Sequence, residues 1–67
     1  MKYPKKALDQ VRHMLALHDK GLSHKKAGEH AEFAKTATKW HQTFSDIRQA
    51  YTMDDIFNMQ DIIKREV

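Results

Sequence analysis

The 67-residue sequence has no cysteine, a single proline, two glycines and no long run of apolar residues. Without cysteine the chain has no disulfide staple, no thiol nucleophile and no zinc site built on thiolates, which fits a reducing compartment. A membrane-spanning helix needs about 20 consecutive apolar residues, and charged residues interrupt every candidate stretch, including the one that follows the N-terminal lysines. We therefore expect a soluble, cytoplasmic protein that folds as one small domain.

Residue patterns typical of enzymes are also missing. The sequence contains no HExxH motif, no phosphate-binding glycine loop and no nucleophile motif. His24 and His30 are six residues apart, a spacing that does not align two metal ligands on one face of a helix. We therefore expect no catalysis, no bound metal and no cofactor.

Charge is distributed unevenly along the chain, whose formal net charge is +3. Residues 1–41 contain nine lysines or arginines, four acids and all five histidines, whereas residues 42–67 contain three basic residues and five acids. The histidines make the first part more cationic as the pH falls toward their ordinary pKa of about 6.5. A polyanion would therefore prefer the N-terminal part of the chain.

The N-terminal segment has the pattern of an amphipathic helix. Pro4 suits a helix start, because its fixed φ and missing donor are tolerated in the first turn. Apolar residues then follow the spacing of one buried stripe: Ala7, Leu8, Val11, Met14, Leu15 and either His18 or Leu22. Local chemistry predicts that this helix ends near Lys20, because Gly21 supplies a left-handed stop and Ser23 can cap a second helix over residues 24–31.

Two further helices are predicted from periodicity and capping. A third helix is indicated by residues that recur every three or four positions: Ala37, Trp40, Phe44, Ile47 and Tyr51. Thr52 and Asp55 have the spacing of a capping box, which places a fourth helix at residues 53–66. The fold class is therefore predicted to be all-α: one domain, residues 1–67, built as a compact bundle of about four helices.

Within residues 23–44, five positions have the spacing of a helix-turn-helix unit: Ala27, Ala31, Thr36, Ala37 and Trp40. On these residues the chain resembles the helix-turn-helix superfamily of bacterial and phage repressors, recombinases and transposases. Ala31 stands where that superfamily has its turn glycine. The resemblance implies a turn at residues 31–34, followed by a recognition helix that enters the major groove of double-stranded DNA.

The resemblance also implies which side chains contact DNA. On the recognition helix the residues predicted to contact bases are Lys35, Thr38, Lys39, Gln42 and Thr43. At the start of the preceding helix, the residues predicted to contact phosphates are Ser23, His24, Lys25 and Lys26. The implied function is that of a small transcriptional regulator of phage, plasmid or mobile-element type that acts by occupying its operator.

The predicted last helix carries more apolar surface than one packing face requires. Its apolar residues spread around much of the helix circumference, and the excess predicts a homodimer. The residues assigned to that interface are Met59, Ile62, Ile63 and Val67.

A different layout is compatible with the same sequence. One uninterrupted helix over residues 23–51 would place on one seam Ala27, Ala31, Ala34, Ala37, Trp40, Phe44, Ile47 and Tyr51. Such a protein would be a helical module that binds or inhibits a partner protein. The backbone at residues 31–34 distinguishes the two layouts: a chain reversal there favours DNA binding, and a continuous helix favours a protein partner.

Overall fold

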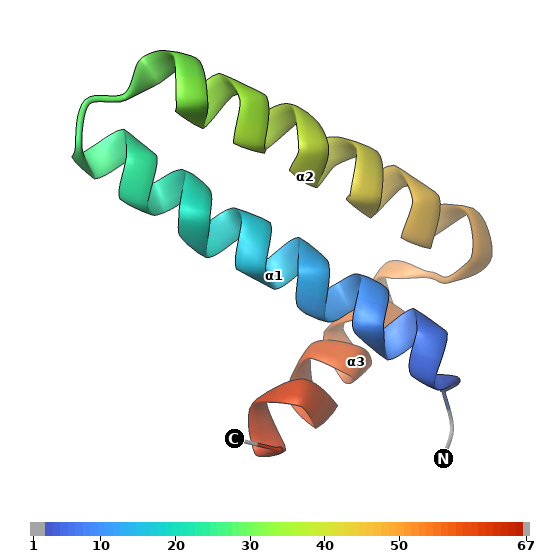
Figure 1. The fold of residues 1–67 in the computed structure, drawn as a ribbon. Helices are drawn as coiled ribbons and strands as arrows, with labels where there is room; N and C mark the ends of the chain where they lie inside the picture. Colours follow the sequence, from blue (N-terminus) through green and yellow to red (C-terminus); the bar gives the residue numbers. More distant parts are fainter. Residues whose placement is uncertain (1–2, 67) are drawn as a thin grey trace.

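The computed structural model describes residues 3–66, in which all regular secondary structure is helical. Helix α1 spans Lys5–Lys26, α2 spans His30–Ala50 and α3 spans Met53–Arg65. The first two form a long antiparallel hairpin, and α3 lies across the N-terminal half of α1 (Figure 1). The all-α prediction is confirmed, but the chain has three helices where about four were predicted.

The predicted break at Gly21 is wrong, because α1 continues through it to Lys26. Gly21 is a buried interior residue of this helix, and a glycine in a helix interior costs only about 1 kcal/mol relative to alanine. Ser23 is likewise not an N-cap. It lies inside α1, where its carbonyl accepts a hydrogen bond from the Ala27 amide at 3.1 Å. Packing against α2 therefore extends the helix past a locally plausible stop.

The chain reverses instead at Gly28, the only residue among 3–66 with a positive φ, at +75°. The amide of Glu29 donates to the carbonyl of His24 at 2.9 Å, and the amide of Gly28 donates to Lys25 at 3.2 Å. These two bonds form a Schellman motif, which satisfies the last carbonyls of α1. The reversal thus uses the chemistry expected of Gly21, but seven residues later.

No turn exists at residues 31–34, which form the start of α2. The predicted helix-turn-helix geometry is therefore wrong at this position. Ala31 has the negative φ of an ordinary helical residue, and alanine is the strongest helix former, so nothing local interrupts the helix. The alternative layout is also wrong in part, because the break at residues 27–29 separates Ser23 from α2. In addition, Ala31 and Ala34 are exposed and do not form an inward seam.

The hydrophobic core lies where α3 meets the hairpin. Its buried residues are Tyr3, Ala7, Leu8, Val11, Met14, Ile47, Ile56 and Met59. The capping box predicted at the start of α3 is confirmed: the Thr52 hydroxyl accepts from the Asp55 amide at 3.2 Å, and the Asp55 carboxylate accepts from the Thr52 amide at 3.1 Å. The other oxygen of this carboxylate accepts a hydrogen bond from the Tyr3 hydroxyl at 2.9 Å.

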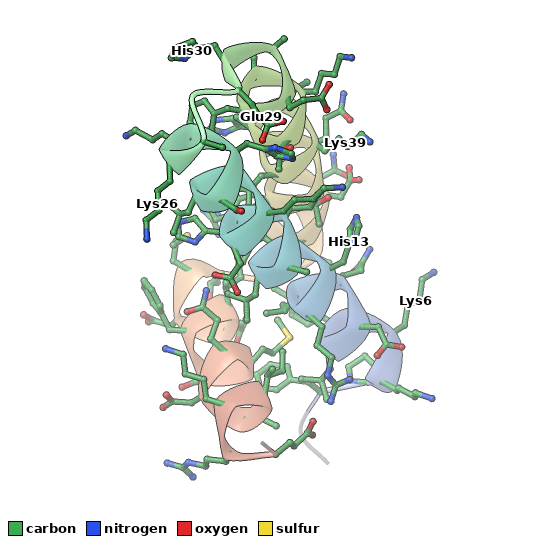
Figure 2. All side chains as sticks on the ribbon, turned by 60° about the vertical axis from the view of Figure 1, so that its left-hand side comes forward. Lys6, His13, Lys26, Glu29, His30 and Lys39 are labelled. Carbon is green, nitrogen blue, oxygen red and sulfur yellow. The ribbon has the colours of Figure 1, made fainter. Side chains whose placement is uncertain are left out.

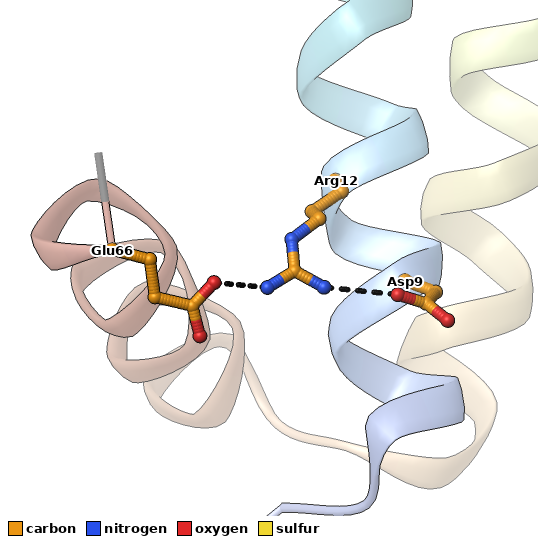
Figure 3. Close-up of polar contacts among 3 residues, drawn as sticks. All are labelled: Asp9, Arg12 and Glu66. Atoms are coloured by element: carbon orange, nitrogen blue, oxygen red, sulfur yellow. Dashed lines mark hydrogen bonds and ion pairs between the residues drawn. The ribbon is translucent and has the colours of Figure 1, made fainter.

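A charged contact fixes the end of α3 on α1 (Figure 3). The Arg12 guanidinium donates through Nη2 to the Glu66 carboxylate and through Nη1 to Asp9 at 2.9 Å. The hydrogen bond to Glu66 raises the pKa of Arg12 above its already high ordinary value. Arg12 is therefore cationic at every physiological pH, and α3 is held at both its ends.

The two glycines predict opposite responses to substitution by alanine. A Cβ at Gly21 would lie 3.6 Å from Thr36 Cγ2, an ordinary van der Waals contact, so Gly21→Ala should stabilise the fold by about 1 kcal/mol. Gly28→Ala should destabilise it by about 1–2 kcal/mol, because alanine is strained at a positive φ. Urea unfolding followed by circular dichroism measures both. If Gly21→Ala lowered the free energy of unfolding and Gly28→Ala did not, the chain would have to reverse at Gly21 and not at Gly28.

Candidate functional site

Four of the residues predicted to contact bases share one exposed face of α2. Lys35, Thr38, Lys39 and Gln42 are all exposed and follow helical spacing, whereas Thr43 is half-buried. The Thr38 and Thr43 hydroxyls donate to backbone carbonyls one turn earlier, at 3.0 and 2.9 Å. Lys35 Nζ lies 3.7 Å from the Glu32 carboxylate. The structure therefore places four of these residues on one solvent-exposed helix face. The threonine hydroxyls are already hydrogen-bonded to the backbone.

The residues predicted to contact phosphates lie at the wrong end of a helix for that purpose. Ser23, His24, Lys25 and Lys26 form the last turns of α1, where free carbonyls replace free amides. Backbone donors are therefore not available there, and the cations instead stabilise the negative end of the helix dipole. His24 Nδ1 lies 3.4 Å from Glu29, and its Nε2 is buried without a hydrogen-bond partner.

Basic side chains do not gather on one face of the hairpin. In Figure 2, Lys6, His13 and Lys39 project on one side of the molecule, Lys26 projects on the other, and His30 lies at the hairpin tip. A polar hollow on the edge of the hairpin mixes both signs of charge; it is lined by Lys5, Lys6, Asp9, Gln10, His13, Thr43 and Asp46. The positive charge of the N-terminal part is therefore spread around the hairpin.

Most of the residues predicted to form a dimer interface pack in or against the core of the single chain. Met59 is completely buried, and Ile62 and Ile63 are half-buried against the core cluster. Val67 lies outside the described residues. Because these side chains cover α1 within one protomer, little of the surface that motivated the dimer remains free. The apolar residues that α3 does expose are Met53 and Phe57.

An apolar groove runs between α1 and α2 in the half of the hairpin nearest the loop. It encloses about 220 Å³. Its floor and walls consist of small or apolar residues, namely Leu17, Gly21, Leu22, Phe33, Thr36, Ala37 and Trp40. The only hydroxyl among them, that of Thr36, donates to the Glu32 carbonyl at 2.8 Å, while the Thr36 methyl faces Gly21. The groove therefore presents apolar surface to a ligand.

The groove is open because α3 lies across the N-terminal half of α1 and does not run along the hairpin toward its loop (Figure 1). On α2, Phe33, Ala37 and Trp40 continue the helical stripe that reaches the core at Phe44 and Ile47. The groove is thus continuous, along α2, with the stripe that reaches the core.

Aromatic contacts hold the principal wall of the groove in place. The Trp40 indole stacks on Phe44 with ring centroids 5.2 Å apart and an interplanar angle of 9°. Its edge meets the His41 ring at a centroid separation of 5.1 Å. Leu22, on the opposite wall, exposes 44% of its surface. The groove therefore has one fixed aromatic wall and one exposed aliphatic wall.

Cationic or protonatable groups stand at the rim of this groove. They are His18 and Lys25 on α1 and His41 on α2. His18 Nδ1 lies 4.0 Å from the Asp19 carboxylate. Lys25 and His41 form no ion pair with any residue of the described part of the chain. The groove therefore combines an apolar interior with a rim that carries one uncompensated cation, Lys25, and two histidines.

The sequence pattern did not predict this groove. It indicated Leu22 only as an alternative to His18 at the end of a buried stripe, and it did not single out Phe33. The facing of Gly21 and Phe33 depends on where the hairpin reverses, which no local pattern specifies. The one signal in the sequence was an apolar residue, Leu22, next to a glycine, Gly21. The structure shows Leu22 exposed and Gly21 buried.

No protein-family model, no curated protein and no solved structure matches this chain. Among residues 3–66 no group of three or more potential metal ligands is found. No helix in the same range combines the length and apolar character needed to cross a membrane. The groove is therefore the feature on which a functional argument rests.

Proposed function

We propose that this protein is a helical interaction module that binds an amphipathic helix of a partner protein in the groove between α1 and α2. The observation that carries the proposal is the unpartnered apolar strip formed by Leu22, Phe33 and Trp40. Amphipathic helices bind such grooves by inserting side chains spaced three and four residues apart. The continuous helix at residues 31–34 is the backbone geometry expected of a protein-binding module.

The packing of α3 supports this mode of binding. Helix α3 buries Ile56 and Met59 in the core that it forms with the hairpin. A partner helix would extend the same interaction toward the hairpin loop. The groove is short, so the complex is expected to belong to the small, transient class of interfaces.

Synthetic peptides and the single tryptophan provide a direct test. Three peptides of about 18 residues, or five helical turns, share one leucine stripe, lack tryptophan and carry flanks of glutamate, glutamine or lysine. Trp40 is the only tryptophan in the chain and lines the groove. Binding of at least one peptide should shift the Trp40 emission to shorter wavelength, because the peptide removes water from the indole.

Two matched variants locate the binding site. Leu22 and Phe57 are both large exposed apolar residues, at 44% and 56%, but only Leu22 lines the groove. Leu22→Ser should weaken peptide binding by about tenfold, since it removes most of one buried side chain, whereas Phe57→Ser should leave binding unchanged. Equal effects of the two substitutions, or no emission shift with any peptide, would contradict the proposed function.

A second proposal, binding of double-stranded DNA, rests on the exposed face of α2. Lys35, Thr38, Lys39 and Gln42 lie together on that face and are free of tertiary packing. In this case the protein would contact DNA with the side of a long helix and not through a helix-turn-helix.

Fluorescence anisotropy with a random DNA duplex tests this second proposal. Binding at low salt should weaken steeply as salt rises, because each phosphate contact releases a counterion. Replacing Lys35 and Lys39 together by alanine should abolish binding, whereas the same charge loss at Lys64 and Arg65 on α3 should have a smaller effect. The absence of any anisotropy change at low salt would eliminate DNA as a ligand.

A further inference from the structure

We infer that the helix bound by the groove is acidic, with carboxylates on both flanks of its apolar stripe. This inference rests on the proposed function and specifies the chemistry of the partner. It is carried by the rim of the groove, where His18, Lys25 and His41 surround an apolar interior. Within residues 3–66, the ion pair of these three residues with an acid is that of His18 with Asp19.

The rim groups have the spacing of helical turns. His18 and Lys25 are seven residues apart on α1, which places them on one side of the groove about 10 Å apart along the helix. His41 lies on α2, on the other side. A helix in the groove that carries carboxylates seven residues apart on one flank would meet His18 and Lys25, and a carboxylate on the other flank would meet His41.

Lys25 would form the strongest of these contacts with a carboxylate of the partner helix. Its ammonium group has no ion-pair partner within residues 3–66, so a carboxylate from a partner would not have to displace an existing one. His18 and His41 add hydrogen-bond donors at neutral pH and further positive charge when protonated. An acidic helix thereby gains charge-assisted hydrogen bonds that a neutral or basic helix lacks.

The contact between α3 and α1 shows the same chemistry one segment away. There, an apolar stripe of α3 is buried while the carboxylate of Glu66 binds the Arg12 guanidinium of α1. The partner helix would repeat this combination closer to the hairpin loop, with Lys25 in the role of Arg12.

A second copy of the chain is a poorer occupant than a separate partner. The acidic helix of the described chain is α3, and its apolar stripe at Ile56 and Met59 is already buried in its own core. Its outer face offers only Met53 and Phe57 as large exposed apolar residues. A second copy therefore has no free acidic amphipathic helix to insert.

The three peptides described above separate charge preference from apolar binding. At low salt the glutamate-flanked peptide should bind at least about tenfold tighter than the glutamine-flanked one, and the lysine-flanked peptide should bind weakest, because opposite charges attract and like charges repel across the rim. The preference for glutamate should shrink as salt rises, while the binding shared by the glutamate and glutamine peptides should persist.

Adjacent lysines supply the matched control. Lys25 and Lys26 both lie in the last turn of α1, but only Lys25 lines the groove. Lys25→Gln should weaken the glutamate-flanked peptide about fivefold and leave the glutamine-flanked peptide unchanged, whereas Lys26→Gln should affect neither. Thermal unfolding of both variants checks that the loss of a cation at the helix end affects stability equally.

Three other results would contradict the acidic preference, and one of them would also contradict the proposed function. Equal affinity for all three peptides, with Leu22 still required, would refute the acidic preference and leave the proposed function intact. No binding of any peptide would refute both. Sedimentation that shows a dimer, abolished by Leu22→Ser, would mean that a second copy fills the groove and would likewise refute the inference.

Discussion

The left-handed conformation of Gly28 is the constraint on which the rest of the structure depends. It sets the point at which α1 ends and α2 begins, and hence the register in which two long helices face each other. That register places Phe33 and Thr36 over Gly21, where a Cβ would be in ordinary van der Waals contact with both side chains. A reversal seven residues earlier would have paired other residues across the two helices and separated Phe33 from Gly21.

The placement of α3 is the second determinant of the exposed surface. The helix crosses the N-terminal half of α1 and does not extend along the hairpin toward its loop (Figure 1). It covers the part that contains the core and leaves the groove beside Leu22 and Trp40 uncovered. The interior glycine of the groove costs helix stability without serving any turn. The buried core is therefore concentrated at one end of the molecule and the open groove at the other.

Features encoded by local chemistry were predictable from the sequence. The helix start after Pro4, the capping box at Thr52 and the buried stripe through Val11 and Met14 all occur as expected, because each depends on residues within one or two turns.

Features that depend on distant contacts were not predictable in this way. Gly21 and Gly28 can both adopt the left-handed conformation that ends a helix. Only packing against α2 determines which of them does so. Four of the five residues with the spacing of the helix-turn-helix superfamily belong to the continuous helix α2, since helical periodicity alone generates such spacing, and Ala27 lies in the break before it. The groove was missed for the same reason, because its two walls are joined only by the hairpin register.

The most direct test of the account is a titration of isotopically labelled protein with the glutamate-flanked peptide, followed residue by residue in amide NMR spectra. The account predicts that shifts concentrate on both walls of the groove, around Leu22 and Lys25 on α1 and around Ala37 and Trp40 on α2, while the outer face at Lys39 is unaffected. Shifts confined to that outer face, or spread evenly over the protein, would contradict it.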